Sequence, residues 1–236
     1  MKLSVIIPVY NEKATILKIL KKIENVQDIQ KQIIIIDDGS TDGSYELIKG
    51  FNFISEYKII RHDSNSGKGS CIKSSQNYIS GDVVIIQDAD LEYDPQDYKD
   101  IINTIYKKDK KVVYGSRVLN QQRYNQKNFI SNFRIFANHI LTLLTNLLFF
   151  QNLTDAHTCY KAFDSKVFKK IKLKEDDFAF CPEITAKVSK LGFKIYEVPI
   201  SYFGRGYNEG KKITIYDGFR AILVLFKYRI FWLVNY

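Results

Sequence analysis

The stretch IIIIDDGS at residues 33–40 decides the fold. Its four consecutive β-branched residues predict a strand buried on both faces, because such strands are continuous apolar runs rather than alternating ones. The polar residues that follow predict a turn directly after the strand. A buried strand that stops at carboxylates is typical of the ligand-binding edge of a parallel sheet.

Similar apolar runs lie on either side of this stretch, separated by segments with helical periodicity. We expect further strands at residues 3–9, 57–60, 83–87 and 112–116, and helices at residues 13–24, 44–49 and 70–79. This alternation predicts an α/β fold with a mostly parallel sheet flanked by helices. A chain of 236 residues suits one such domain with a small appendage.

Polar motifs follow three of the predicted strands. They are Tyr10-Asn11-Glu12, Asp37-Asp38-Gly39-Ser40 and Asp88-Ala89-Asp90. Because ligands bind beyond the carboxyl ends of parallel strands, we expect the three motifs to form one site.

Asp88 and Asp90 flank one small residue at a strand end. Alternation directs their side chains to the same side, where two carboxylates can hold Mg²⁺ or Mn²⁺. Glu92 would add a further oxygen. Such an ion would act as a Lewis acid on a leaving diphosphate. The alternative is a pair of solvated loop acids.

Asp37 and Asp38 have two interpretations that do not exclude each other. A carboxylate after a buried strand accepts hydrogen bonds from a nucleobase or a ribose hydroxyl, whereas Asp38-Gly39 can also form a turn and Ser40 or Thr41 can cap a helix. Gly67-Lys68-Gly69 offers flexible backbone and a cation to a nucleotide, but its spacing is not that of a P-loop. No G-x-G-x-x-G follows a predicted strand, which argues against a nicotinamide enzyme.

The formal net charge of +9 favours anionic partners, although compositional bias explains it equally well. Aromatic and basic residues do not interleave as a nucleic-acid stacking groove requires, so we expect no nucleic-acid partner. The three cysteines, Cys71, Cys159 and Cys181, show no CxxC pair, and their spacing indicates neither a zinc site nor a disulfide framework.

Two segments have amphipathic helical patterns. In residues 129–150 one face collects the apolar side chains Phe129, Phe133, Phe136, Ile140, Leu143, Leu144 and Leu147. In residues 213–234 the corresponding residues are Tyr216, Phe219, Leu223, Phe226 and Ile230. Each face would lie in a membrane interface, or alternatively pack on the sheet or on a partner subunit. No apolar run is long enough to predict a membrane span.

Five motifs in order resemble the family 2 glycosyltransferases. They are SVIIPVYNE at residues 4–12, IIIIDDGSTDGS at 33–44, NSGKG at 65–69, IIQDADLEYDP at 85–95 and YGSR at 114–117. Within that family the chain looks most like the polyprenol-phosphate sugar synthases, typified by dolichol-phosphate mannose synthase. The resemblance runs from residue 3 to about residue 212 and implies a GT-A (Rossmann-like) fold.

The resemblance also implies a donor site. Its nucleotide-sugar contacts would be Pro8, Tyr10, Glu12, Asp37, Asp38, Lys68, Asp88 and Ala89. Asp90 matches the closer ligand of a Mg²⁺ or Mn²⁺ ion, with Asp88 and Glu92 as further ligands. Glu92 stands where some relatives have Gln.

On the acceptor side, Arg117 matches a basic residue near the transferred phosphates and sugar, and Arg205 and Lys211 match a basic loop that clamps phosphates. Residues 155–161 resemble the family's acceptor-side element, with Cys159 in place of the usual Gly. Asp155 in this element would orient the acceptor, act as a base, or cap a turn. By resemblance, the catalytic residues are therefore Asp90, Arg117 and Asp155.

Two further residues have competing interpretations. His157 lies in the acceptor-like element, where packing is the alternative to a direct role. Glu183 resembles a recurring acid of the family near the sugar or acceptor, and structural capping is its alternative.

Together these features imply a metal-dependent, inverting transfer of a hexose from a donor of the GDP-mannose or UDP-glucose type to a polyprenyl phosphate. We expect a GT-A domain at residues 1–212, including an interfacial helix at about 129–150, and a C-terminal amphipathic segment at 213–236. The protein would bind peripherally or monotopically at the cytoplasmic face of a membrane. Some relatives carry C-terminal transmembrane helices, which this sequence lacks, so we expect any multispanning partner to be a separate protein. The alternatives are a saccharide acceptor, or a non-catalytic nucleotide-sugar-binding membrane scaffold.

Overall fold

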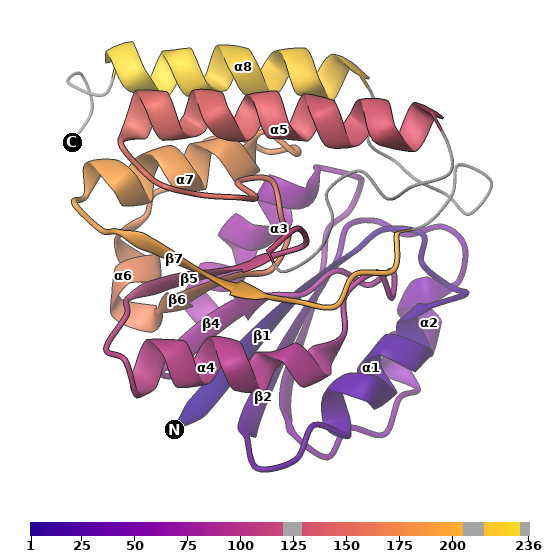
Figure 1. Ribbon diagram of the computed structural model, residues 1–236. Coiled ribbons are helices and arrows are strands. Elements are labelled where there is room, and N and C mark those ends of the chain that lie inside the picture. Colours follow the sequence, from indigo (N-terminus) through magenta and orange to yellow (C-terminus); the bar gives the residue numbers. More distant parts are fainter. Residues whose placement is uncertain (120–128, 205–214, 232–236) are drawn as a thin grey trace.

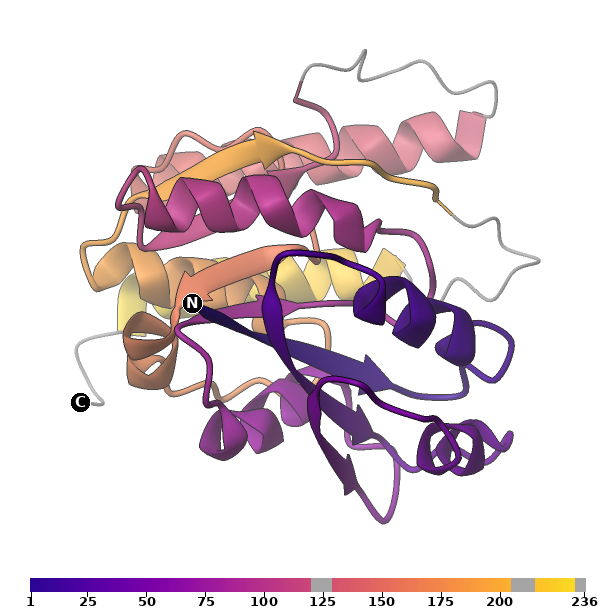
Figure 2. The ribbon, with the colours of Figure 1, turned by 90° about the horizontal axis from the view of Figure 1, so that it is seen from below.

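The computed structural model describes residues 1–119, 129–204 and 215–231, without the side chains of residues 129–134 and 215. In these residues one seven-stranded sheet has the order β3-β2-β1-β4-β6-β5-β7. β6 pairs antiparallel with β4 and β5, and the other neighbouring strands are parallel. The indigo and purple strands β1, β2 and β3 point the same way in Figure 2.

The elements have the following bounds. The strands are β1 (Lys2–Val9), β2 (Gln30–Asp37), β3 (Glu56–Arg61), β4 (Val83–Ile86), β5 (Val112–Ser116), β6 (Lys161–Asp164) and β7 (Ile195–Pro199). The helices are α1 (Ile16–Glu24), α2 (Ser44–Lys49), α3 (Lys68–Ser75), α4 (Tyr98–Tyr106), α5 (Phe129–Phe149), α6 (Ser165–Lys170), α7 (Phe180–Lys190) and α8 (Ile215–Ile230). Two short 3₁₀ helices are η1 (Gln76–Tyr78) and η2 (Pro95–Asp97).

Apolar side chains fill both faces of the sheet, as the continuous β-branched runs predict. In β1, Val5 and Ile7 belong to a core shared with α1, α2 and α4, whereas Ile6 belongs to a second core shared with α3, α6 and α7. α4 and α7 accordingly lie on opposite sides of the sheet in Figure 1. The expected α/β fold with a mostly parallel sheet is confirmed.

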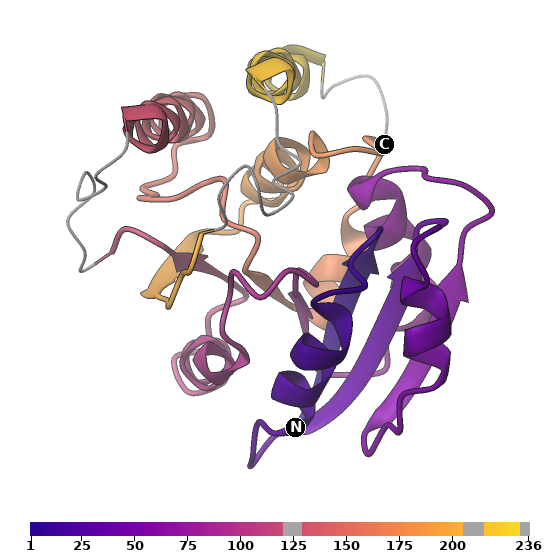
Figure 3. The same ribbon diagram turned by 90° about the vertical axis from the view of Figure 1, so that its right-hand side faces the viewer.

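An additional layer of two helices covers the outer face of α7. α5 and α8 lie side by side above it in Figures 1 and 3. Their contact with α7 is a small third core that contains Phe149, Ala186, Val224, Leu225 and Tyr228. The two amphipathic segments therefore use one face each for packing within the chain.

Candidate active site

The three polar motifs meet at the carboxyl edge of the sheet, as expected. Tyr10 follows β1, Asp38 follows β2, and Asp88 lies just beyond β4. Because β1 is the central neighbour of both β2 and β4, these strand ends adjoin one another. Lys68 begins α3 after β3, and Arg117 follows β5 at the same edge.

The Asp38 carboxylate is buried and already engaged by the protein. Its Oδ1 accepts a hydrogen bond from Nδ1 of His62 at 2.7 Å. The backbone N–H groups of Ser66 and Gly67 donate to Oδ1 and Oδ2 at 3.0 and 2.8 Å. These bonds fix the loop between β3 and α3 on the end of β2. A nucleobase would therefore share a carboxylate that holds this loop.

Asp37 and the motif after β1 are tied together by turn contacts. Asp37 Oδ1 accepts a bond from the N–H of Ser40 at 3.1 Å, while its buried Oδ2 has no hydrogen-bond partner within the described ranges. The Ser40 hydroxyl in turn accepts a bond from the N–H of Asn11 at 3.0 Å. The N–H of Glu12 donates to the hydroxyl of Ser44, which starts α2, at 2.9 Å. The bond between Asp37 and Ser40 and the left-handed backbone of Gly39 agree with the turn interpretation. The cap interpretation was wrong, because the N-cap of α2 is Gly43 and no side chain caps that helix. The nucleotide contacts of Asp37 and Asp38 stay predictions, as do those of Pro8, which lies in β1, and Tyr10.

Lys68 and Asp88 form an ion pair beside Cys159. The Lys68 ammonium contacts the Asp88 carboxylate and lies 3.3 Å from Cys159 Sγ. Burial lowers the pKa of Lys68, but the Asp88 carboxylate more than compensates, so this pKa lies above its ordinary value. Ala89, the next residue, is buried in the core. A protonated Lys68 is therefore available at the edge where a diphosphate is expected.

Asp90 and Glu92 have different environments, although both were predicted to bind the metal. Asp90 is partly exposed, and its Oδ1 accepts a bond from the N–H of Glu92 at 3.1 Å. Glu92 is buried, and its Oε2 accepts a bond from the Tyr202 hydroxyl at 2.8 Å. In the described part of the chain, Asp88, Asp90 and Glu92 do not form a cluster with all ligand atoms within 4.8 Å of one another. The carboxylates of Asp88 and Asp90 have the oxygen chemistry that Mg²⁺ and Mn²⁺ prefer.

Arg117 and Asp155 form a two-pronged ion pair. Arg117 Nε and Nη2 donate to the two Asp155 oxygens at 2.7 and 2.8 Å, and the Arg117 N–H adds a bond of 3.1 Å. Burial lowers the pKa of Arg117 and raises that of Asp155. Their mutual attraction outweighs burial, so the pKa of Arg117 is raised and that of Asp155 is lowered. Both are ionised at neutral pH, and a carboxylate with a lowered pKa is a weak base.

Glu197 of β7 supports Asp155 from behind. Its carboxylate accepts bonds from the N–H groups of Thr154 and Asp155 at 2.7 and 2.9 Å. On the other side, the Arg117 guanidinium lies 5.2 Å from the Tyr202 ring centroid. Asp155 thus holds Arg117 in place, a contact that none of its sequence-based interpretations included, and its role as a base stays a prediction.

The loop before α7, which includes residues 174–177, contacts the start of α3. A Cβ atom added to Gly69 would clash with the carbonyl oxygen of Glu175, and one added to Gly67 would clash with that of Asp176. The N–H of Ser70 donates to the same Asp176 oxygen at 2.9 Å. The same loop is paired with α8, through Arg220 to Asp177 and Lys227 to Glu175. One loop therefore joins the glycines around Lys68 to α8.

His157 and Glu183 differ in how fully they are bonded. Glu183 is buried and accepts bonds from the N–H groups of Lys174 and Glu175, which supports its structural interpretation. The His157 Nε2 is buried without a hydrogen-bond partner among the residues described. Burial and the neighbouring Lys161 ammonium lower the pKa of His157 to about 4. His157 is therefore neutral at physiological pH.

Several expectations were incomplete. Arg205 and Lys211 lie outside the described residues, and so do the side chains of Phe129 and Phe133. Leu144 was expected on one apolar face with Leu143 and Leu147, but it is partly buried against the third core whereas those two are exposed. No sequence pattern predicted a role for His62, Tyr202 or Glu197. The only available signal was position, since His62 directly follows β3 and Glu197 lies in β7.

The faces of α5 and α8 that point away from α7 expose large apolar side chains. We define the apolar helix surface as the residues Phe136, Ile140, Leu143, Leu147, Tyr216, Phe219, Leu223, Phe226 and Ile230, each at least 42% exposed. Large exposed apolar patches mark interaction sites for proteins, membranes or ligands. Across the described residues, neither of these helices nor any other meets the length and hydropathy needed to span a bilayer.

The chain is similar in sequence to known glycosyltransferases. The family described as glycosyl transferase family 2 matches residues 4–172. A dolichol-phosphate mannosyltransferase of Pyrococcus furiosus is 28% identical over 231 residues, covering 97% of this chain and 64% of that protein. A UDP-N-acetylglucosamine–dolichyl-phosphate N-acetylglucosaminyltransferase of Methanococcus voltae is 28% identical over 236 residues, covering 91% of each chain.

Solved structures share the fold at low sequence identity. A glucosyl-3-phosphoglycerate synthase from Mycobacterium tuberculosis, crystallised with Mn²⁺, uridine diphosphate and phosphoglyceric acid, superimposes with a TM-score of 0.69 at 16% identity. The match covers 97% of this chain and 78% of that one. This similarity supports the GT-A-like architecture.

Proposed function

Because the chain belongs to glycosyl transferase family 2, we propose that it transfers a hexose from a nucleotide sugar to a polyprenyl phosphate at a membrane surface. Two relatives with such names cover 97% and 91% of the chain. The donor would be of the GDP-mannose or UDP-glucose type. We place the protein at the cytoplasmic face of the membrane, bound peripherally or monotopically.

The observation that carries this proposal is the apolar helix surface. Nine exposed apolar side chains on two adjacent helices would enter the boundary between headgroups and acyl chains of a bilayer. α8 is connected to the donor edge by the loop that contains Glu175 and Asp176, so a membrane-bound enzyme would keep its donor site close to the lipid. The enzyme could then bind the phosphate of an acceptor whose hydrocarbon tail stays in the membrane.

The acceptor chemistry requires charge stabilisation more than a strong base. A phosphate monoester is mostly ionised at neutral pH, because its second pKa is about 6. Its oxygen can attack the anomeric carbon directly, which would invert the configuration. The difficult steps are holding two anionic groups together and stabilising the diphosphate that leaves. The lowered pKa of Asp155 makes this carboxylate a weak base, which agrees with a reaction that needs no strong base.

The residues of the carboxyl edge supply suitable groups. Arg117, held by Asp155, would bind an oxygen of the leaving diphosphate or of the accepting phosphate. Asp90 and Asp88 would hold a Mg²⁺ or Mn²⁺ ion, which when bound neutralises the diphosphate as a Lewis acid. Lys68 would add a positive charge nearby. Arg205 and Lys211, outside the described residues, are proposed to contact the same phosphates.

The proposal is tested by transfer of radiolabelled sugar from a panel of nucleotide sugars to undecaprenyl or dolichyl phosphate in the presence of Mg²⁺ or Mn²⁺. We expect label in the organic phase that EDTA and Asp90→Asn abolish. The anomeric configuration of the product, determined by NMR, would report on inversion. Label transferred to a saccharide or to water, without a lipid product, would refute the proposed acceptor. Donor binding without any turnover would favour the non-catalytic nucleotide-sugar-binding scaffold.

A further inference from the structure

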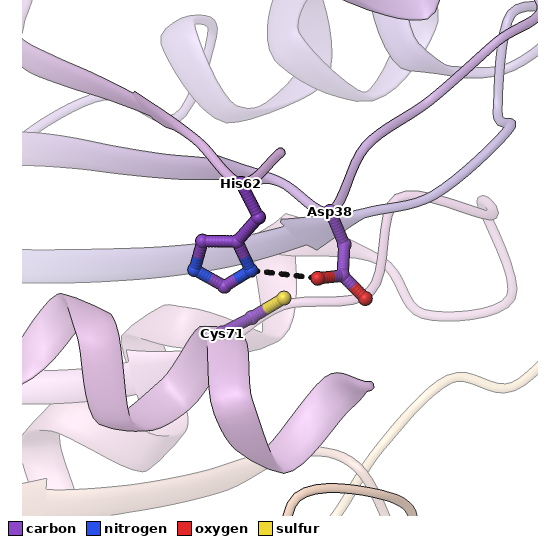
Figure 4. A group of neighbouring side chains, drawn as sticks. All are labelled: Asp38, His62 and Cys71. Carbon is purple, nitrogen blue, oxygen red and sulfur yellow. Dashed lines mark hydrogen bonds and ion pairs between the residues drawn. The ribbon is translucent and has the colours of Figure 1, made fainter. Parts of the chain in front are cut away.

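Three side chains from three separate elements converge behind the carboxyl edge of the sheet. Asp38 follows β2, His62 follows β3, and Cys71 lies in α3. Their side chains point toward one another in Figure 4. One potential ligand atom from each, an Asp oxygen, a His ring nitrogen and the Cys sulfur, lies within 4.8 Å of the other two. Carboxylate oxygen, imidazole nitrogen and thiolate sulfur are the donor atoms with which proteins bind zinc.

Hydrogen bonds from neighbouring groups orient the His62 ring and the Asp38 carboxylate. Ligating histidines generally hydrogen-bond through their second ring nitrogen, and here Nε2 of His62 lies 2.8 Å from the Ser74 hydroxyl. The backbone N–H groups of Ser66 and Gly67 likewise hold the Asp38 carboxylate. Ring and carboxylate orientations are therefore fixed before any ion arrives, which lowers the entropic cost of binding.

We propose that Asp38, His62 and Cys71 form a second metal site, distinct from Asp88 and Asp90, that binds a transition-metal ion of the zinc class. Thiolate and imidazole ligands favour Zn²⁺ and Co²⁺ over Mg²⁺, which prefers oxygen. Three protein ligands leave a fourth position for water. The sequence spacing gave no sign of such a site, because residues 38, 62 and 71 are brought together only by the parallel strands and α3.

Binding requires one small movement and the loss of one proton. Ligands on a tetrahedral zinc ion lie roughly 3.3–3.8 Å apart, as follows from metal–ligand distances of 2.0–2.3 Å. The 2.7 Å contact between His62 and Asp38 would therefore widen slightly. The His62 proton would move from Nδ1 to Nε2, where Ser74 accepts it. Burial and the Asp38 carboxylate raise the pKa of the Cys71 thiol, so its proton is released as the sulfur–metal bond forms. Affinity should rise about tenfold for each pH unit.

Co²⁺ is the probe for this site, because a cobalt–thiolate bond has a charge-transfer absorption in the near ultraviolet. We expect the full chain to bind one Co²⁺ with this band, and Zn²⁺ to displace it whereas Mg²⁺ does not. Cys71→Ser and His62→Gln should abolish the band. Ser74→Ala should weaken binding by about 10- to 100-fold, as supporting residues of metal sites do.

Three controls separate this site from other groups. Cys181→Ser removes a different buried thiol and should keep the band, and Asp90→Asn should keep it although it alters the proposed Mg²⁺ site. Circular dichroism of each variant without metal checks folding, and the partly exposed His62 provides a ligand variant that leaves the core intact. No band at saturating Co²⁺, or a band that survives Cys71→Ser or is lost in Cys159→Ser, would overturn the proposal. These readouts do not depend on transferase activity.

Discussion

At the scale of single residues, the ion pair between Arg117 and Asp155 determines which changes the site tolerates. Arg117→Lys keeps the charge but loses the two-pronged geometry, because an ammonium is a single point of contact. We predict a loss of kcat/KM on the order of 100-fold in the lipid-phosphate assay, typical for removal of an oriented cation or donor. Turnover equal to wild type would exclude a phosphate-binding role for Arg117.

Arg117→Ala should instead act on stability. It leaves the buried Asp155 carboxylate unpaired, which costs about 3–5 kcal/mol. Urea unfolding measures this difference. Lys111→Ala is the matched control, because it removes an exposed partner of Asp164 and should change the free energy of unfolding by about 1 kcal/mol or less. Equal losses in the free energy of unfolding for the two variants would show that another group pairs with the Asp155 carboxylate when Arg117 is absent.

His157 should make stability depend on pH. Its pKa is about 4 in the folded chain against an ordinary 6.5. As pH falls from 6.5 towards 4, His157 becomes protonated in the unfolded chain but stays neutral in the folded chain. The free energy of unfolding therefore decreases in that interval. The contribution is on the order of 3 kcal/mol. Urea unfolding at several pH values should show a shallower loss for His157→Gln, and parallel curves for the two proteins would contradict this assignment.

Sequence alone identified Arg117 and Asp155 separately but not their contact. Residues 117 and 155 lie 38 positions apart in the sequence, and the pairing of β5 with β6 and β7 brings them together. For the same reason Asp38 was recognised as a strand-end carboxylate, whereas its bond to His62 was not. Motif order thus predicts which residues line the edge, and side-chain pairing requires the fold.

At the scale of elements, α3 depends on small residues at its start. Gly69→Ala would gain about 0.5–1 kcal/mol of helix propensity but would force the Glu175 carbonyl away, at a cost of about 1–3 kcal/mol. We therefore predict net destabilisation by urea unfolding. Gly218→Ala in α8, where an added Cβ meets no atom within 4 Å, is the control and should stabilise. A stabilised Gly69→Ala would mean that the loop moves freely.

The apolar helix surface should govern membrane binding. Leu147 and Leu223 are 72% and 69% exposed, so Leu147→Ser/Leu223→Ser should fold normally. Each buried leucine contributes about 1.5–3 kcal/mol, so vesicle binding measured by co-sedimentation should fall by at least about 100-fold. Ile54→Ser removes an 87% exposed apolar residue elsewhere and should have no effect. Equal binding by all three proteins would assign the apolar helix surface to a protein partner instead.

Elements were predictable where the local pattern was strong. The apolar runs of β1, β2, β3, β4 and β5 were recognised, and the helices α5 and α8 were expected from their periodicity. β6 is only four residues long, and its Lys161 is buried, so its sequence does not resemble a strand. α7 likewise has the charged residues Glu183 and Lys187 at buried positions, where they form an ion pair.

At the scale of the whole molecule, the net charge of +9 should add to membrane attraction. Raising ionic strength from about 0.15 M to 1 M shortens the Debye length from about 8 Å to 3 Å. We predict weaker binding to anionic vesicles in high salt and little change for zwitterionic vesicles, where apolar contacts dominate. Binding to anionic vesicles that does not respond to salt would show that the positive charges face away from the bilayer.

The close approach of Gly69 to Glu175 has a consequence for how homologous chains can diverge. No residue larger than glycine fits at position 69 while the loop keeps its present path. Substitution there becomes acceptable only together with a change in the length or path of the loop around residues 174–177. Position 69 and this loop lie about a hundred residues apart in the sequence. In aligned homologues, a residue larger than glycine at position 69 should therefore occur together with a loop of different length or path.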